Sequence, residues 1–508
     1  MSSVANGAGG HLARLGAQAQ GVLAALRRAG VAVTGLSADT RALGAGDVFL
    51  AYPGERADGR RFIAQAIAEG AAAVLWEREG FAWDGAWRLP NLPVEHLRAL
   101  AGPLAAEVYG HPSERLWTIG VTGTNGKTST SQWIAQALAA RATRTAVIGT
   151  LGLGFPGALE PALNTTPDAI LLQRALARFA DAGAQAVAIE VSSIGLDQGR
   201  VNGVAFDVAL FTNLSRDHLD YHGSMEAYAQ AKMRLFDSPG LEHAVLNLDD
   251  ALGVRIAQHL AGSGVARVGY SIGDGAARRS GLARWLEAHD VRFGDGGLAF
   301  ALASSWGDAV VEAPLVGRFN VANVLGVLGV LLVSGVPLAA AARLARDFEP
   351  VVGRMQRLGG AGRPTVVIDY AHTPDALDKV LGAVADAARA RGGRLVCVFG
   401  CGGERDRGKR PLMGEAASRH ADFVIVTSDN PRGEDPGAII AEILPGVAVP
   451  HRAVVDRREA IRAAVAEASP DDVIVLAGKG HEPYQEIGGE RIPFSDAEEA
   501  RHALEARP

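Results

Sequence analysis

From Leu116 onward, short apolar runs alternate with stretches of helical periodicity, which is the pattern of strands followed by helices. Because parallel strands need a long crossover connection, this order predicts βαβ units and a largely parallel sheet. Residues 278–314 lose the alternation, and we expect irregular strands and turns there. The first series of predicted strands is WTIGVT (117–122), RTAVIGT (144–150), QAVAIEV (185–191), DVALFT (207–212) and HAVLNLD (243–249).

A second series begins after FEPVVGRM (348–355), and YGHPSE (109–114) is typical of a linker. A chain of 508 residues is long enough for three domains of roughly 150 residues each. We therefore predict an α/β protein with a small mixed α/β domain at 1–114, a central domain with a phosphate-loop ATPase-like parallel sheet at 115–349, and a Rossmann-like domain at 350–508. The strands predicted in the last domain are TVVIDY (365–370), GRLVCVFG (393–400), DFVIVT (422–427) and DVIVLAG (472–478).

Charge and composition narrow the class of protein. The chain has 50 Lys and Arg against 56 Asp and Glu, a formal net charge of −6, whereas proteins that coat nucleic acid are normally basic. Hydrophobic residues make up 48% and charged residues 21%, which excludes wholesale disorder and a fibrous fold. Any anionic substrate must therefore be bound by local positive features.

Two segments bear on the location of the protein. The N-terminal residues 1–16 lack the apolar core of a signal peptide and are expected to form a short Gly/Ala/Ser tail. Residues 319–342 carry no charge, but Asn320, Asn323 and the GVP break at 335–337 favour two buried helices over a membrane span. These features predict a soluble cytoplasmic protein.

The two cysteines, Cys397 and Cys401, are too few for a disulfide framework or a structural zinc site. They lie around the end of an apolar run. We therefore expect two buried or semi-buried thiols in a reducing compartment.

The segment GVTGTNGKTST (120–130) lies between a predicted strand and a predicted helix that opens near Lys127. Its glycines allow backbone N–H groups to approach anionic oxygens, and a helix N-terminus adds a partial positive charge. Lys127 would reach the β- and γ-phosphates, and the Thr128 hydroxyl would bind Mg²⁺. Val121 stands where the strict phosphate-loop pattern has its first glycine, but the context favours a nucleoside triphosphate site over a simple tight turn.

Three later residues have the chemistry of metal ligands. Glu190 ends the strand AVAIE, where doubly wound sheets place their ligand sites. His218 lies in the polar run FTNLSRDHLDYHG (211–223), and Lys232 lies in a helical segment. Taken singly, each has an ordinary interpretation as a cap, a turn residue or a solvated lysine. Their shared position after the strands of a phosphate-loop domain favours a joint role.

Eleven motifs in this order resemble those of the Mur ligases, and in particular the branch that adds diaminopimelate. The resemblance extends from about Asp39 to Glu498 and is far more specific than the phosphate loop alone. The motifs are GVTGTNGKTST, NTTPD (164–168), EVSS (190–193), FTNLSRDHLDYHG, AKMRLF (231–236), GRFNVANVLG (317–326), GRMQRLG (353–359), DYAHTPDAL (369–377), FGCGGERDRGKRPLM (399–413), TSDNPRGEDP (427–436) and AGKGHEPYQ (477–485).

The resemblance implies an ATP-dependent ligase of peptidoglycan precursor synthesis that acts as a monomer. A substrate carboxylate attacks the γ-phosphate of ATP, and the incoming amine then displaces phosphate from the acyl phosphate. Because two anions must meet, catalysis must rest on charge neutralisation and positioning. The resemblance implies that the third domain closes over the second before chemistry. The implied partners are ATP, Mg²⁺, UDP-N-acetylmuramoyl-L-alanyl-D-glutamate and meso-diaminopimelate.

The resemblance also assigns residues to the nucleotide and to the metal. It implies catalytic roles for Lys127, Lys232, His218 and Glu190. Magnesium would be held by Thr128, Glu190, His218 and a CO₂-derived carbamate on Lys232, because a carbamate supplies anionic oxygens where an ammonium would be repelled. The implied ATP contacts are Gly123, Thr124, Asn125, Gly126, Lys127, Thr128, Ser129, Asn323, Arg354, Asp369 and His372.

The muramoyl substrate would be held by the first domain and by part of the second. NTTP is also an ordinary turn sequence, so this assignment depends on the resemblance. The implied contacts are Ala38, Thr40, Arg41, Glu55, Arg56, Ala57, Asn164, Thr165, Thr166, Ser192, Gln198 and Arg200.

DNPR (429–432) is the specificity element that the resemblance points to. Diaminopimelate differs from lysine by a distal carboxylate, and the planar guanidinium of Arg432 can pair with it through two hydrogen bonds. A site built for that pairing loses heavily when the carboxylate is missing. The implied contacts to the amino acid are Arg405, Asp429, Asn430, Pro431, Arg432, Gly478 and Glu482.

The chain departs from the family pattern at two positions. Ile194 follows the two serines of EVSS where relatives often have histidine, and Glu404 replaces an aspartate before Arg405. Three alternatives stay open: a lysine-adding ligase, which DNPR disfavours; a folate-polyglutamate ligase, which the ADTR segment (38–41) disfavours; and a phosphate-loop ATPase switch, which leaves DNPR and GKGHE without a role.

Overall fold

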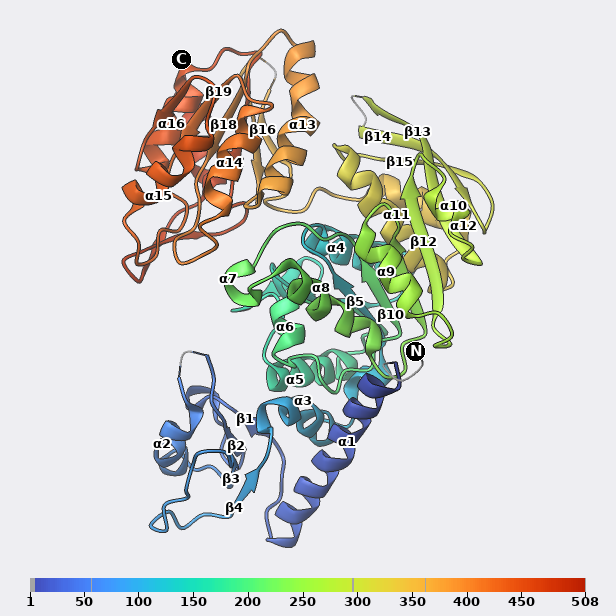
Figure 1. Ribbon diagram of the computed structural model, residues 1–508, viewed down its shortest axis with the longest axis vertical. Coiled ribbons are helices and arrows are strands. Elements are labelled where there is room, and N and C mark those ends of the chain that lie inside the picture. Colours follow the sequence, from blue (N-terminus) through green and yellow to red (C-terminus); the bar gives the residue numbers. More distant parts are fainter. Residues whose placement is uncertain (1–4, 56, 295–296, 361, 508) are drawn as a thin grey trace. The chain divides into compact units, whose positions relative to one another are not determined.

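The computed structural model describes residues 5–55, 57–294, 297–360 and 362–507 (Figure 1). The chain divides into two compact units. The first contains Met1–Gly123, Ile134–Phe211 and Ala229–Gly269, and the second contains Thr124–Trp133, Thr212–Tyr228 and Tyr270–Pro508. The predicted domain limits, 1–114, 115–349 and 350–508, stay predictions.

The N-terminal part of the first unit is a small parallel sheet covered by helices. Its strands are β1 (Leu36–Ser37), β2 (Val48–Ala51), β3 (Ala73–Glu77) and β4 (Asn91–Val94), paired in that order. The helices are α1 (Ala5–Arg28), α2 (Ile63–Ala68) and α3 (Leu97–Val108). One core cluster joins Leu15, Leu23 and Leu26 of α1 to residues of β2, β3 and α3.

The expected N-terminal tail is wrong from Ala5 onward, because α1 begins there. Burial of leucines along the helix stabilises it despite the glycines, which by themselves disfavour a helix. The expected linker at 109–114 also has structure: Tyr109 ends α3, and the 3₁₀ helix η3 (Pro112–Arg115) follows.

The central sheet contains β5 (Trp117–Thr122), β6 (Thr145–Gly149), β7 (Gly152–Phe155), β8 (Ala158–Glu160), β9 (Ala186–Glu190), β10 (Val208–Phe211) and β11 (His243–Asn247). In the first unit its order is β11-β10-β5-β9-β6-β7-β8. The five predicted strands β5, β6, β9, β10 and β11 are confirmed and pair in parallel, whereas β7 and β8 are antiparallel. The parallel strands are almost entirely buried, which explains their unbroken apolar runs.

The register of this sheet places three strand ends at one edge. Val121 pairs with Glu190, and Thr122 pairs with Phe211. The glycine-rich turn, Glu190 and the polar run after β10 therefore all start from neighbouring carboxyl ends, where open α/β sheets bind ligands. The helices that follow are α4 (Lys127–Ala139), α5 (Ala169–Asp181), α6 (Ser193–Asp197), α7 (Leu219–His222), α8 (Met225–Met233) and α9 (Ala251–His259).

Residues 278–314 are more regular than expected. After β12 (Ala266–Ile272) and α10 (Ala276–Arg279), β13 (Arg284–Gly294), β14 (Gly297–Ser304) and β15 (Ala309–Ala313) form an antiparallel meander. The strand β14 alternates buried and half-buried positions, as expected for a sheet with one covered face. The predicted strands are present, but they pair in a regular meander, and Leu298, Phe300 and Leu302 take the buried positions of β14.

The uncharged segment 319–342 forms the two expected helices, α11 (Arg318–Val333) and α12 (Leu338–Leu344). Pro337 precedes the second helix as its N-cap. Among the residues that the structure describes, no helix combines the length and the apolar character that crossing a bilayer requires.

The C-terminal sheet has helices against both faces (Figure 1). Along β18 (Leu395–Phe399), Leu395, Cys397 and Phe399 join one core cluster, and Val396 and Val398 join the other. The other strands are β16 (Gln356–Gly359), β17 (Thr365–Asp369), β19 (Phe423–Val426), β20 (His451–Ala453) and β21 (Val473–Ala477), and the order is β16-β17-β21-β18-β19-β20. The helices are α13 (Pro374–Ala390), α14 (Lys409–Ser418), α15 (Pro436–Ile443), α16 (Arg457–Glu467) and α17 (Asp496–Glu505), and β22 (Tyr484–Ile487) and β23 (Glu490–Pro493) form a hairpin.

Strands β17, β21, β18 and β19 are parallel, so their carboxyl ends share one edge. Four loops start there and carry the motifs DYAHTP, GGERD, DNPR and GKGHE. The fold therefore gathers motifs that lie more than 100 residues apart in the chain. Cys397 and Cys401 are buried free thiols, as expected, and burial raises the pKa of Cys401 to about 12.

Candidate active site

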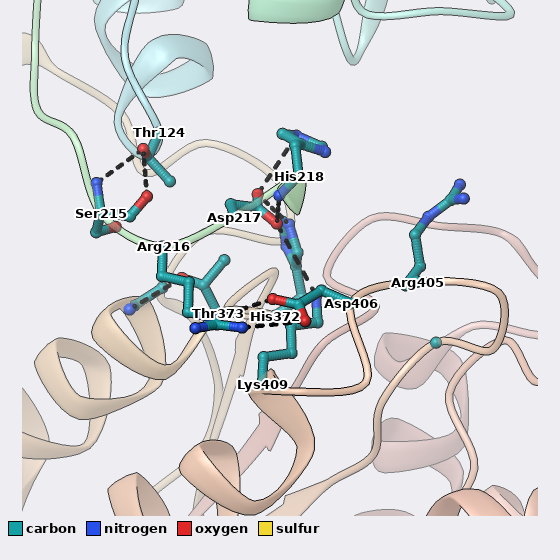
Figure 2. Close-up of polar contacts among 12 residues, drawn as sticks. Thr124, Ser215, Arg216, Asp217, His218, His372, Thr373, Arg405, Asp406 and Lys409 are labelled. Atoms are coloured by element: carbon teal, nitrogen blue, oxygen red, sulfur yellow. Dashed lines mark hydrogen bonds and ion pairs between the residues drawn. The ribbon is translucent and has the colours of Figure 1, made fainter. Parts of the chain in front are cut away.

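The glycine-rich turn is held by the segment that follows β10. Asn213 accepts a hydrogen bond from the Asn125 backbone N–H at 3.0 Å through Oδ1, and its Nδ2 donates to the Asn125 carbonyl at 3.0 Å. Thr212 donates to the same carbonyl at 2.6 Å. On the other side, Thr124 Oγ1 accepts from the Ser215 N–H at 3.0 Å (Figure 2). The turn is thus a preorganised cradle of backbone groups.

The close approach of the Asn323 side chain explains why position 126 in this turn is a glycine. Gly126 has φ +88°, and a Cβ atom there would lie 2.5 Å from Oδ1 of Asn323 on α11. Asn323 is itself buried and donates to Asn320 Oδ1 at 3.1 Å. The predicted nucleotide residues Gly126 and Asn323 therefore lie side by side.

The predicted phosphate-binding side chains lie at the start of α4. Lys127 Nζ donates to the Thr124 carbonyl at 2.9 Å. The Thr128 hydroxyl accepts from Arg354 at 3.3 Å, and the Arg354 guanidinium lies 4.4 Å from the centre of the Tyr370 ring. Ser129 is buried one residue further along the helix.

The carboxylate of Asp217 connects three cationic or titratable side chains. Its Oδ2 lies 3.3 Å from His218 Nε2 and 3.5 Å from His372 Nε2, and its Oδ1 lies 4.0 Å from Lys409 Nζ (Figure 2). Burial alone would raise the pKa of the Asp217 carboxyl, but the hydrogen bond with His372 and the charges of His218, His372 and Lys409 hold it well below its usual range. Arg216, the preceding residue, pairs with Asp406 at 2.9 Å.

Asp369 is a buried carboxyl at the end of β17. It accepts hydrogen bonds of 2.8 Å from the backbone N–H groups of Met355 and Ala371. Burial raises the pKa of Asp369, and the Arg354 charge and the two N–H groups only partly offset this effect. Asp369 thereby fixes the loop that carries His372, whose Nδ1 lies 2.8 Å from the Tyr370 carbonyl.

Glu190, at the end of β9, is completely buried. Its Oε1 accepts from the Thr150 N–H at 2.9 Å, and its Oε2 accepts from the Thr150 hydroxyl at 3.0 Å. A Cβ atom on Gly149 would lie 2.0 Å from Oε1, so the side chain occupies space that only a glycine leaves open.

Gly149→Ala is expected to displace the Glu190 carboxylate and to lower kcat/KM about 100-fold, because small misplacements of a reacting group have effects of this size. Steady-state kinetics with varied Mg²⁺ measure the change. Gly21→Ala is the control, since nothing lies within 4 Å of its added Cβ on α1. Equal kcat/KM values for the two variants would contradict the predicted role of Glu190 in catalysis and magnesium binding.

The predicted muramoyl contacts of the central domain form one hydrogen-bonded group. Thr166 Oγ1 accepts from the Ser192 N–H at 2.9 Å, and Arg200 donates to the Thr166 carbonyl at 2.8 Å and to Gln198 Oε1 at 2.7 Å. Thr165 contacts Thr150 at 3.0 Å, which links the group to Glu190. Asn164, by contrast, is exposed.

Glu55 joins the N-terminal part to this group. Its carboxylate accepts a hydrogen bond from Gln198 and lies 3.8 Å from Arg98. Arg56, another predicted contact, lies outside the described residues. The Ala57 carbonyl accepts a hydrogen bond from the Gly54 N–H at 2.9 Å.

The ADTR segment lies apart from these hydrogen bonds. Ala38 packs partly against the N-terminal core, and Thr40 starts the short 3₁₀ helix η1 (Thr40–Ala42). Arg41 is exposed and pairs with the neighbouring Asp39 at 2.7 Å. Among the residues that the structure describes, no hydrogen bond or ion pair connects these residues to Glu55, so their proposed role depends on the resemblance.

In the C-terminal loops, Asn430 is a hub. Its Oδ1 accepts from Lys479 Nζ and from the Glu486 N–H, each at 3.0 Å, and its Nδ2 donates to Glu482 Oε2 at 2.8 Å. Glu482 also accepts from the Tyr370 hydroxyl at 3.3 Å. DNPR and GKGHE are thereby joined.

The remaining predicted amino-acid contacts lie in the same loops. Arg432 has φ +53° and donates to the Gly403 carbonyl at 2.7 Å, and its Nε lies 3.4 Å from Glu486. Arg405 is exposed, and Figure 2 shows it pointing away from the Asp217 cluster. Pro431 is buried, and a Cβ atom on Gly478 would lie 2.4 Å from the buried Asp429 carboxylate.

Lys232 lies on α8 with only 1% of its surface exposed. A charged ammonium is costly to bury, whereas a neutral amine is tolerated. The carbamate that the resemblance implies on Lys232 stays a prediction.

Several residues of the site were not singled out from the sequence. Asp217, Lys409 and Lys479 lie inside the recognised motifs but have no chemical signature of their own. Asn213 and Asp375, which accepts from Asn125 Nδ2 at 3.2 Å, are ordinary polar residues until the fold brings them to the turn. Only the motif positions could have pointed to them.

Comparison with known proteins shows which family the chain resembles along most of its length. The family models described as "Mur ligase family, catalytic domain", "Mur ligase middle domain" and "Mur ligase, glutamate ligase domain" match residues 32–109, 121–331 and 353–480. The chain is 54% identical over 479 residues to a UDP-N-acetylmuramoyl-L-alanyl-D-glutamate--2,6-diaminopimelate ligase of Ralstonia nicotianae, with 93% of each chain covered. It is 51% identical to the protein of the same name from Janthinobacterium sp., which covers 93% of this chain and 94% of that protein.

A solved structure of a UDP-N-acetylmuramoyl-L-alanyl-D-glutamate--2,6-diaminopimelate ligase aligns with a TM-score of 0.64 at 39% identity. The alignment covers 93% of this chain and 95% of that chain. The three-domain α/β fold is thus shared with known ligases of this kind. The chain belongs to the Mur ligase family and is an enzyme of the ligase class.

Proposed function

We propose that the enzyme joins meso-diaminopimelate to the D-Glu carboxylate of UDP-N-acetylmuramoyl-L-alanyl-D-glutamate at the expense of ATP, in the cytoplasmic synthesis of peptidoglycan precursors. The observation that carries this proposal is the similarity over more than nine-tenths of the chain to ligases named for diaminopimelate. The loop arrangement of the C-terminal sheet supports it, because Arg405 and Arg432 follow adjacent parallel strands.

The reaction has two steps. A D-Glu carboxylate oxygen bonds to the γ-phosphorus as the bond to the β-phosphate oxygen breaks, which gives an acyl phosphate and ADP. The diaminopimelate amine then bonds to the acyl carbon, loses a proton, and expels inorganic phosphate. Lys127 and the backbone N–H groups of the turn stabilise the negative charge that the first step concentrates.

The donor set is compatible with magnesium. Among the residues that the structure describes, no cluster of three or more His, Cys, Asp or Glu forms a metal site. Mg²⁺ usually binds through one or two carboxylates and substrate phosphates, and this needs fewer protein ligands. Thr128, Glu190, His218 and a carbamate on Lys232 would hold the ion, which when bound neutralises charge on the phosphates.

Phosphate release tests the proposal directly. With ATP and Mg²⁺, we expect release to require both the UDP-muramoyl dipeptide and diaminopimelate. Equal turnover with L-lysine would instead identify a lysine-adding ligase. Hydrolysis independent of both substrates would identify an ATPase switch.

Arg432→Asn is expected to lower kcat/KM for diaminopimelate on the order of 100-fold, because the distal carboxylate loses its charged partner. Asparagine tolerates the positive φ at this position, so the backbone should stay in place. The KM for ATP should not change. An unaltered preference for diaminopimelate over lysine would refute the assignment of Arg432.

A further inference from the structure

The loops after β18 and β19 pack backbone against backbone. The Gly403 N–H donates to the Asn430 carbonyl at 2.9 Å, and a Cβ atom on Gly403 would lie 2.0 Å from the Pro431 carbonyl oxygen. A Cβ atom on Gly402 would lie 2.9 Å from the Arg432 guanidinium. The position of one loop therefore determines the position of the other.

Glu434, two residues after DNPR, joins this pair of loops to α14. Its carboxylate accepts hydrogen bonds of 2.9 Å and 3.0 Å from the guanidinium of Arg410, and it also accepts from the backbone N–H of Glu404. Arg410 is only 1% exposed. The hydrogen bonds from Arg410 and from the Glu404 N–H hold the pKa of Glu434 below its usual range, so the carboxylate is charged near neutral pH.

These contacts extend to Arg405 and Arg432, the two arginines that would bind diaminopimelate in the proposed function. Arg405 follows Glu404 directly and donates to its carbonyl at 3.1 Å. Arg432 donates to Gly403 at 2.7 Å. The loop of Arg405 and the loop of Arg432 thus meet at one ion pair, in which Arg410 is buried and Glu434 is about a quarter exposed.

We propose that Arg410 and Glu434 are positioning residues that set the separation of Arg405 and Arg432 and so determine recognition of a dicarboxylic diamino acid. The inference rests on the proposed function. Two carboxylates at a given distance require two guanidinium groups at a matching distance. A substrate with one carboxylate has no such requirement, so a disturbed separation penalises diaminopimelate more than lysine.

Glu442 on α15 provides a matched control. It also pairs with Arg410, at 2.8 Å, and with Arg407, and its side chain is 31% exposed against 24% for Glu434. Glu442 contacts the loop of Arg405 only at Arg407, next to the start of α14, and among the described residues its hydrogen bonds and ion pairs do not extend to Glu404 or Arg432. A purely structural role of the Arg410 network predicts similar effects for the two glutamates.

The test is steady-state kinetics of the full chain with Glu434→Ala, Glu434→Gln and Glu442→Ala. We expect Glu434→Ala to raise the KM for diaminopimelate about tenfold and to narrow the preference over lysine, with unchanged KM values for ATP and the UDP-muramoyl dipeptide. Glu434→Gln keeps an acceptor for the Glu404 N–H and should have an intermediate effect. Glu442→Ala should leave the preference unchanged.

Equal changes in the Glu434 and Glu442 variants, or an unchanged preference in both Glu434 variants, would overturn the inference. If Glu434→Ala does not fold, Arg410→Lys tests the same ion pair, since a lysine cannot bridge both oxygens in the same way. If the proposed function itself is wrong, the enzyme without substitutions will not require diaminopimelate, which distinguishes the two failures.

Discussion

Lys232→Ala is expected to lower ligase activity by roughly three orders of magnitude, and a small carboxylate such as acetate should restore part of it. The lysine is 1% exposed, and a carbamate at this position would provide anionic oxygens for magnesium. Alanine removes those oxygens and leaves space for an added carboxylate. Turnover measured with and without acetate tests this expectation.

Lys232→Met distinguishes the loss of the carbamate from the loss of side-chain packing. Methionine fills the buried volume, so its fold should survive, but it leaves no room for acetate. We expect it to be inactive and not to respond to acetate. The activity of the enzyme without substitutions should fall in CO₂-depleted buffer and recover when bicarbonate is added. Full activity of Lys232→Ala without additive would exclude the carbamate.

Arg457→Ala is expected to lower the stability of the C-terminal domain by about 3–5 kcal/mol, because it leaves a buried charge without its partner. Arg457 and Asp496 are both completely buried and form two contacts of 2.7 Å. The same guanidinium donates to the carbonyls of Ser428 and Ala477, directly before DNPR and GKGHE. Denaturant unfolding followed by circular dichroism measures the loss.

An exposed ion pair on the same domain is the control. Arg452 and Glu467 lie 2.8 Å apart with about half of each side chain exposed, so Arg452→Ala should leave the unfolding transition almost unchanged. The double variant Arg457→Met with Asp496→Leu should be more stable than Arg457→Ala, because no unpaired charge stays buried. A cost for Arg457→Ala no larger than that for Arg452→Ala would refute the argument.

Elements with strong local patterns were predictable. The apolar runs of β5, β9 and β18 are buried on both faces, so their composition alone indicates strands. The helix start at Lys127 and the place of Glu190 at a strand end followed from the same pattern. Helix α1, which its buried leucines stabilise, was missed, and the regular pairing of the strands β13–β15 was not foreseen, because both depend on contacts with other parts of the chain.

The sequence by itself determined the α/β class, the order of the parallel strands, and the motifs that carry phosphate and amino-acid chemistry, because these depend on local periodicity and residue type. Only the tertiary structure decided that Asp217 meets His372 and Lys409, and that Glu434 links Arg410 to the loop of Arg405. The reason is that parallel sheets bring distant carboxyl ends to one edge, and the pairing of side chains across those loops depends on register and not on local sequence.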